Sequence, residues 1–157
     1  MIWSVPTSSS RSLRRSFLDR RLVTSPLRDP VRSTSTMRFA VTFSPEDGFV
    51  RTTVYEPLTP DIAKQLAKES EAIRKREGVA RALLDARQAV CAAELWEQYS
   101  LAYREIGQSI ADRAERIAIL VNPDDRSYDF LEIVFWNAGY NVKSFSDEDN
   151  ALGWLRE

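Results

Sequence analysis

Two short apolar runs constrain the fold of this chain more than any other feature. The first reads Arg81-Ala-Leu-Leu-Asp85 and the second reads Ile117-Ala-Ile-Leu-Val121. Neither run alternates as a strand with one exposed face does, and both are typical of parallel strands that are covered on two sides by helices. Stretches with helical spacing of apolar residues lie between them. We therefore expect an α/β domain built around parallel strands.

Residues 38–55 predict a β-hairpin ahead of these strands. Phe39, Val41 and Phe43 alternate with smaller or polar residues, and the segment 49–55 alternates again and is rich in β-branched residues. The polar segment between them ends in Gly48, which suits a turn that needs a positive φ. The hairpin adds two strands to the expected sheet.

The first helix is expected at 59–78. Thr59 and Pro60 suit a helix start, and Gly78 suits a helix end. The longest helix is expected at 92–113, where apolar residues recur at spacings of three or four.

A third helix follows the turn at 122–125 and ends at Gly139, and a short strand follows at 140–145. Ser146 or Asp147 caps a last helix. The resulting order, β-β-α-β-α-β-α-β-α, predicts a small mixed β-sheet with helices packed on it. In such a sheet the loops after the parallel strands, here 85–91, 122–126 and 146–149, form the default binding edge.

Residues 1–36 differ in composition from the rest of the chain. Seven Arg and two Asp give this segment a net charge of +5, so the remainder of a chain with net charge −1 carries −6. The segment is rich in Ser and Arg and poor in apolar residues, and we expect it to be disordered. It resembles an organelle transit peptide, and the alternative is that Met37 is the true start. The expected domain is 37–157.

The composition excludes several classes of function. Cys91 is the single cysteine and the chain has no histidine, which excludes disulfide frameworks, ordinary zinc sites and His-based triads. Oxygen-ligand metal sites pass this test. The acidic domain lacks a basic stripe, so we expect no nucleic-acid binding. The lone thiol favours the cytoplasm, and no apolar run is long enough to predict a membrane span.

Asp85 and Arg87 flank the loop after the first apolar run. They could bind a polar ligand group, but the interpretation that we favour is structural: Asp85 caps the loop and Arg87 pairs with an acid such as Glu94 or Asp124.

Three acids follow the second apolar run, namely Asp124, Asp125 and Asp129. A metal site would need their oxygens to converge, and the preference of acids for a helix start explains them better.

The aromatic side chains of the expected long helix share one face. Trp96, Tyr99 and Tyr103 are expected to pack in the core against the sheet, with the lining of an apolar ligand cavity as the alternative. Phe135 and Trp136 are adjacent, so one of them is expected to be exposed and available to a partner. Trp154 would extend such a patch.

Several residue runs resemble the STAS domain superfamily, and in particular its SpoIIAA-like branch of anti-sigma-factor-antagonist-like domains. They are Arg81-Ala-Leu-Leu-Asp85-Ala-Arg87, Arg116-Ile-Ala-Ile-Leu-Val121, Phe135-Trp-Asn-Ala-Gly-Tyr-Asn-Val142, Phe145-Ser-Asp and Ala151-Leu-Gly-Trp-Leu155. The resemblance implies a small mixed sheet with helices, and related folds include lipid carriers. Phosphoswitch members carry a Ser after the central strand, whereas the segment 86–93 has no Ser, Thr or Tyr.

The sequence therefore favours a non-enzymatic STAS-like interaction or regulatory module, without cofactor or metal, that binds a protein partner or forms a homo-oligomer. The alternative is a domain that binds an apolar small molecule or lipid, in a pocket between the long second helix and the sheet near Trp96, Tyr99 and Asp85. The candidate ligand or partner residues are Asp85, Arg87, Trp96, Tyr99, Asp124, Arg126 and Trp136.

Overall fold

A computed structural model describes residues 38–106 and 114–157 of the chain. Their element order confirms the order expected from the sequence. The elements are β1 (Phe39–Ser44), β2 (Phe49–Val54), α1 (Pro60–Glu77), β3 (Arg81–Asp85), α2 (Leu95–Ser100), η1 (Leu101–Glu105), β4 (Arg116–Leu120), α3 (Asp129–Asn137), β5 (Asn141–Phe145) and α4 (Glu148–Arg156). The expected disordered segment 1–36 lies outside the described residues, as does the end of the expected long helix at 107–113.

The five strands form one mixed sheet in the order β1-β2-β3-β4-β5. β1 and β2 are antiparallel, as expected for a hairpin, and β2 to β5 are parallel. Gly48 has a φ of 70° in the hairpin turn, a backbone conformation that glycine adopts without steric cost. The central strand β3 lies between β2 and β4, with Thr53 opposite Asp85 and Asp85 opposite Leu120.

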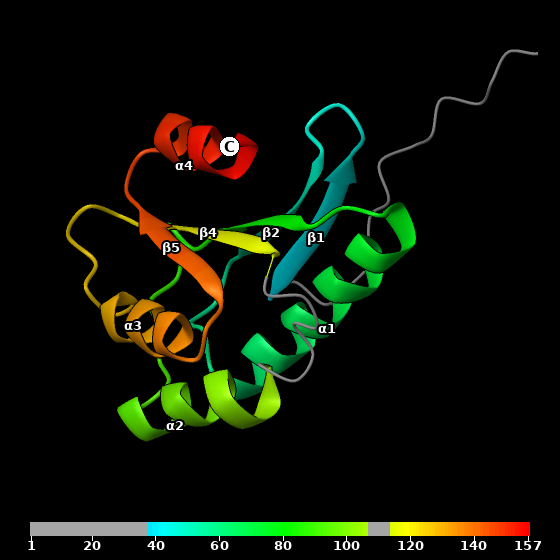
Figure 1. Ribbon diagram of the computed structural model, residues 1–157. Coiled ribbons are helices and arrows are strands. Elements are labelled where there is room, and N and C mark those ends of the chain that lie inside the picture. The colour runs from blue at the N-terminus through cyan, green and yellow to red at the C-terminus, as the bar shows by residue number, and fades with distance from the viewer. Residues whose placement is uncertain (1–37, 107–113) are drawn as a thin grey trace, which may run out of the picture.

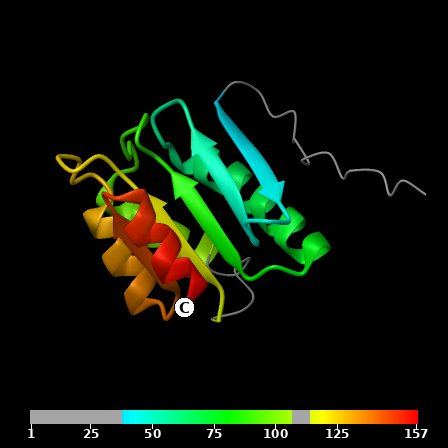
Figure 2. The same ribbon diagram turned by 90° about the horizontal axis from the view of Figure 1, so that it is seen from above.

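Helices cover the two faces of the sheet unequally (Figures 1 and 2). Helices α1, α2 and α3 connect successive parallel strands and lie on one face, because right-handed crossovers that advance in one direction place every helix on the same side. Helix α4 follows the last strand and lies on the opposite face. The larger core therefore lies beneath the three connecting helices, and a smaller core lies beneath α4 and contains Phe49, Leu83, Ala118, Leu120, Ala151 and Leu155.

Local signals set the ends of the helices as the sequence predicts. The Oγ1 of Thr59 accepts a hydrogen bond from the backbone N–H of Ile62 at 3.4 Å, and Gly78 ends α1 with a φ of 69°. Asp147 caps α4, since its Oδ1 accepts from the N–H of Asn150 at 2.9 Å. Both caps satisfy N–H groups that a helix start leaves without a partner.

The second connection differs from the expected long helix. Helix α2 is short, and it continues into a π-helical turn, η1, in which the N–H of Ile106 donates to the carbonyl of Leu101 at 2.8 Å. Its buried residues are Gln98, Leu101 and Ala102. The expectation that Trp96, Tyr99 and Tyr103 pack in the core is wrong, because the opposite face of this helix meets the sheet and these three rings are exposed.

Candidate functional site

The loops after the parallel strands meet at one edge of the sheet, as expected. The amide of Asn122 donates to the carbonyl of Arg87 at 2.6 Å, and the N–H of Ala86 donates to the carbonyl of Leu120 at 2.9 Å. The hydroxyl of the fully buried Tyr128 donates to the carbonyl of Ala89 at 3.0 Å. These hydrogen bonds join the loop after β3 to the loop after β4 and fix both.

Four charged side chains form a cluster at this edge, on the face that carries α4. We call Arg51, Asp85, Arg87 and Glu148 the charge cluster. Arg87 binds Asp85 through two donors, Nε to Oδ1 at 2.9 Å and Nη2 to Oδ2 at 2.6 Å, and its Nη2 lies 3.1 Å from Glu148. Arg51 lies 2.6 Å from Glu148 and 3.6 Å from Asp85. Two cations and two anions thus neutralise each other.

Asp85 is held ionised within the cluster. Its residue is 8% exposed, and the guanidinium of Arg87 lowers the pKa of its carboxyl, with the Arg87 backbone N–H and Arg51 acting in the same direction and burial opposing them. Oδ1 also accepts from the N–H of Arg87 at 3.3 Å. This is the structural role that the sequence favoured for Asp85, but the acids that pair with Arg87 are Asp85 and Glu148 rather than Glu94 or Asp124.

Cys91 lies in the same loop and is half-buried. Its backbone N–H donates to the Oγ of Ser127 at 2.8 Å, and burial raises the pKa of its thiol. A thiol whose pKa is raised is protonated at neutral pH and is therefore a weak nucleophile.

The acids after β4 do not converge. Asp129 pairs with Arg126 at 2.9 Å, and Asp125 accepts from the backbone N–H of Ser127 at 2.8 Å. Within the described residues no group of three or more acidic, thiol or imidazole side chains could hold a metal ion. Asp124 is exposed on this loop, and Arg126 is exposed apart from its pairing with Asp129.

Four large apolar side chains are exposed on α2 and η1. We call Leu95, Trp96, Tyr99 and Tyr103 the aromatic face. Trp96 is 66% exposed and Tyr99 is 50% exposed. The rings of Tyr99 and Tyr103 stack with their centroids 4.4 Å apart, and the indole N–H of Trp96 donates to Oε2 of Glu94 at 2.8 Å.

Trp136 is exposed and Phe135 is buried, as the sequence required of one of the two. Trp136 and Ile133 line a surface groove of about 370 Å³ between α3 and β5. The expectation that Trp154 extends this patch is wrong, because Trp154 lies on α4, across the sheet, where its ring contacts Phe145.

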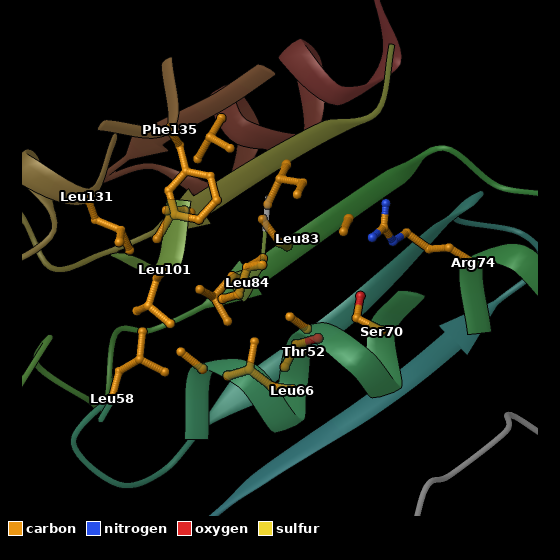
Figure 3. Close-up of a pocket in the computed structure, with 17 residues that line it drawn as sticks. Thr52, Leu58, Leu66, Ser70, Arg74, Leu83, Leu84, Leu101, Leu131 and Phe135 are labelled. Atoms are coloured by element: carbon orange, nitrogen blue, oxygen red, sulfur yellow. The ribbon is translucent and has the colours of Figure 1, made fainter. Parts of the chain in front are cut away.

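An apolar cavity lies between the sheet and the connecting helices, with a volume of about 90 Å³ (Figure 3). Its walls come from β2, β3, β4, β5, α1, η1 and α3. A pocket between the second connection and the sheet was the alternative prediction, but its expected lining was wrong. Trp96, Tyr99 and Asp85 are absent from the lining, because the first two face outward and Asp85 faces the α4 side.

The sequence did not indicate several residues of the charge cluster and of the cavity. Arg51 and Glu148 lie 97 positions apart and join Asp85 only through strand pairing and the position of α4. Arg74 reads as one of several cations at the end of an amphipathic helix, yet it is buried and pairs with Glu115. Ser70 on α1 and Thr52 on β2 are also buried. Their residue types gave no sign of this, because serine and threonine are usually exposed.

Together these elements define a mixed α/β domain with a neutral polar edge, an exposed aromatic face and an interior cavity. No protein-family model and no curated protein matches the chain. Among solved structures, an uncharacterised protein of the DUF3478 family with a SpoIIAA-like fold, from Shewanella loihica PV-4, is similar to it. The match has 18% sequence identity and a TM-score of 0.44, and covers 78% of this chain and 98% of the other.

That neighbour has the fold class that the sequence runs indicated, SpoIIAA-like. At this similarity the neighbour carries no argument about function. Within the described ranges no helix is long and apolar enough to cross a membrane.

Proposed function

We propose that residues 37–157 form a non-enzymatic module that binds a protein partner, or a second copy of this chain, through the aromatic face. The observation that carries the proposal is the exposure of Trp96, Tyr99 and Tyr103 on one side of α2 and η1. Exposed apolar side chains that gather on one surface often mark an interaction site. Trp and Tyr are also the residues that most often dominate the binding energy of protein interfaces.

The side chains of this face are already ordered, which favours binding. The Tyr99–Tyr103 stack and the hydrogen bond from Trp96 to Glu94 restrict the ring rotamers. Less conformational entropy is then lost when a partner covers the rings. Lys64 pairs with Glu105 at 3.1 Å beside this face and adds a polar rim.

The polar edge of the sheet supports a role without catalysis. Both carboxyl oxygens of Asp85 accept from Arg87, so this carboxylate is not free to act as a base on a substrate. Burial keeps the Cys91 thiol protonated at neutral pH. The loop 86–93 also lacks a hydroxyl side chain, so partner switching by phosphorylation of that loop is not part of the proposal. We place the module in the cytoplasm, where a lone thiol stays reduced.

The experiment compares a double variant and a single variant, both on helices of the same layer. Trp96→Ala with Tyr99→Ala removes the centre of the aromatic face, whereas Trp136→Ala removes an equally exposed Trp from α3. Sedimentation velocity measures self-association of residues 37–157, and affinity capture identifies any partner that the unmodified domain retains. We expect the double variant to weaken the complex by about tenfold or more, as is usual for aromatic hot spots.

Two results would count against the aromatic face. A domain that stays monomeric and retains no partner would remove the proposed function. A complex that Trp136→Ala weakens and the double variant does not would move the interface to α3. Both variants change exposed side chains, so circular dichroism should show an unchanged fold.

A further inference from the structure

The cavity beneath the connecting helices combines an apolar body with one polar end. Its apolar lining includes Leu58, Leu66, Leu101, Leu131 and Phe135. Figure 3 shows these side chains toward one end and Arg74 with Ser70 at the other. Empty apolar cavities stay dry and accept small apolar molecules, and one of about 150 Å³ holds benzene. Benzene has six heavy atoms, so a volume of about 90 Å³ suits a molecule of roughly four heavy atoms.

The polar end has an unused hydrogen-bond donor. Arg74 is 3% exposed and its Nη1 forms an ion pair with Glu115. Its Nε is buried and has no hydrogen-bond partner among the residues that the structure describes. A buried N–H without an acceptor costs free energy, and native domains leave few of them. An acceptor atom placed in the cavity beside Arg74 would remove this cost.

The charges at this end select the kind of acceptor. Glu115 already neutralises Arg74, so a second carboxylate would bring an unpaired negative charge into the interior, which is unfavourable. A neutral oxygen, such as that of a ketone or an amide, accepts from Nε without adding charge. We propose that this cavity is a binding site for a small neutral molecule with an apolar body and one carbonyl oxygen, which hydrogen-bonds to Arg74.

The site is separate from the aromatic face. Neither Trp96 nor Tyr99 lines the cavity, so the substitutions that test the partner interface leave the cavity intact. Loss of partner binding and loss of ligand binding are therefore distinguishable outcomes.

The test titrates the full chain with acetone, and with isobutane, acetate and isopropylamine as probes of matched size. Methyl NMR shifts of Leu66, Leu131 and Ile119, which line the cavity, report occupancy. We expect saturable shifts with acetone and binding at least about tenfold weaker for isobutane, which lacks the acceptor. Acetate adds a negative charge and isopropylamine adds a positive charge, so both should bind more weakly still.

Two sets of variants locate the ligand. Ala67→Leu on α1 and Ala82→Val on β3 add methyl groups to the cavity wall, and either should abolish the shifts in a folded domain. Arg74→Met with Glu115→Gln removes the donor and its counter-charge together, so that no unpaired carboxylate remains. This pair should reduce acetone binding to the level of isobutane.

Three results would overturn the proposal. Shifts that do not saturate, or that persist in both filled variants, would place the probe outside the cavity. Equal binding of acetone and isobutane to the unmodified protein would show that Arg74 plays no part. An ordered water held by Nε, seen as a cross-peak from water to that N–H, would show that the donor needs no ligand.

Discussion

Asp85 shows how an acid at the usual ligand-binding edge of a sheet can stabilise the fold instead of binding a ligand. It ends the central strand at the edge where α/β domains usually bind ligands. Its two carboxylate oxygens accept hydrogen bonds from Arg87, and Arg51 forms a longer ion pair with it at 3.6 Å. The cluster joins β2, β3 and the start of α4 through charge-assisted hydrogen bonds, which are stronger than neutral ones.

Asp85→Asn should destabilise the domain at neutral pH by about 1.5–3 kcal/mol, the usual range for hydrogen bonds to charged groups. The pKa of Asp85 is lower in the folded state than in the unfolded state. The stabilisation is therefore full above the unfolded pKa of about 4 and is lost as the pH falls through the folded pKa. Urea unfolding at pH 7 and pH 3 measures the free energy of unfolding of Asp85→Asn and of the unmodified domain.

Asp124→Asn is the matched control, because Asp124 is exposed on the neighbouring loop and outside the charge cluster. It should change stability at pH 7 by less than about 0.5 kcal/mol. A difference between Asp85→Asn and the unmodified domain that stays constant from pH 7 to pH 3 would contradict the role assigned to the ionised carboxylate.

At the scale of single elements, α1 is the one whose ends were predicted most directly. Thr59, Pro60 and Gly78 are local signals, and each acts through the backbone within a turn of its own position. The connection α2–η1 has no such signal at its end within the described residues, and its packing face depends on what lies beneath it.

Gly78→Ala should destabilise the domain by about 1–2 kcal/mol. Gly78 has a φ of 69°, and this left-handed conformation is unfavourable for a residue with a Cβ. A Cβ at this position would meet no atom within 4 Å, so the cost is one of backbone conformation alone. Thermal unfolding followed by circular dichroism measures the change.

Gly153→Ala is the control for this substitution. Gly153 lies inside α4, where a Cβ would also meet no atom within 4 Å, and its φ is not in the left-handed region. Alanine should stabilise the domain here by about 0.5–1 kcal/mol. Equal effects of the two substitutions, in sign and size, would show that backbone conformation is not the cause.

At the scale of the whole molecule, the sheet separates two cores of unequal size. The connecting helices cover the larger one, which holds the cavity, and α4 alone covers the smaller one. The central strand contributes to both cores, since Leu84 lies in the larger core and Leu83 lies in the smaller one. We therefore expect the two cores to unfold together.

Leu155→Ala should destabilise the domain by about 2–5 kcal/mol, because the side chain is fully buried beneath α4 and its loss leaves a cavity. Leu152→Ala should cost less, since Leu152 is only partly buried. Unfolding followed by far-UV circular dichroism and by Trp fluorescence should give one transition. Separate transitions would show that α4 and its core unfold on their own.

Much of the fold was predictable because its signals are local. Strand alternation in 39–43, the apolar runs that became β3 and β4, and the caps of α1 and α4 each depend on neighbouring residues. The order of elements, the hairpin and the mixed sheet follow from these signals together with the handedness of crossovers.

The candidate sites depend on which residues the folded chain brings together, and the sequence determined only part of that. It placed Asp85 and Arg87 at the edge of the sheet and required one of Phe135 and Trp136 to be exposed. The spacing of Trp96, Tyr99 and Tyr103 determined that they share a face of their helix. It could not determine whether that face meets the sheet or the solvent, because helical periodicity is the same in both cases. Only the tertiary structure decided this, by packing Leu101 and Ala102 inward. In the same way it brought Arg51 and Glu148 to Asp85, and buried Arg74 beside the cavity, through contacts between residues far apart in the chain.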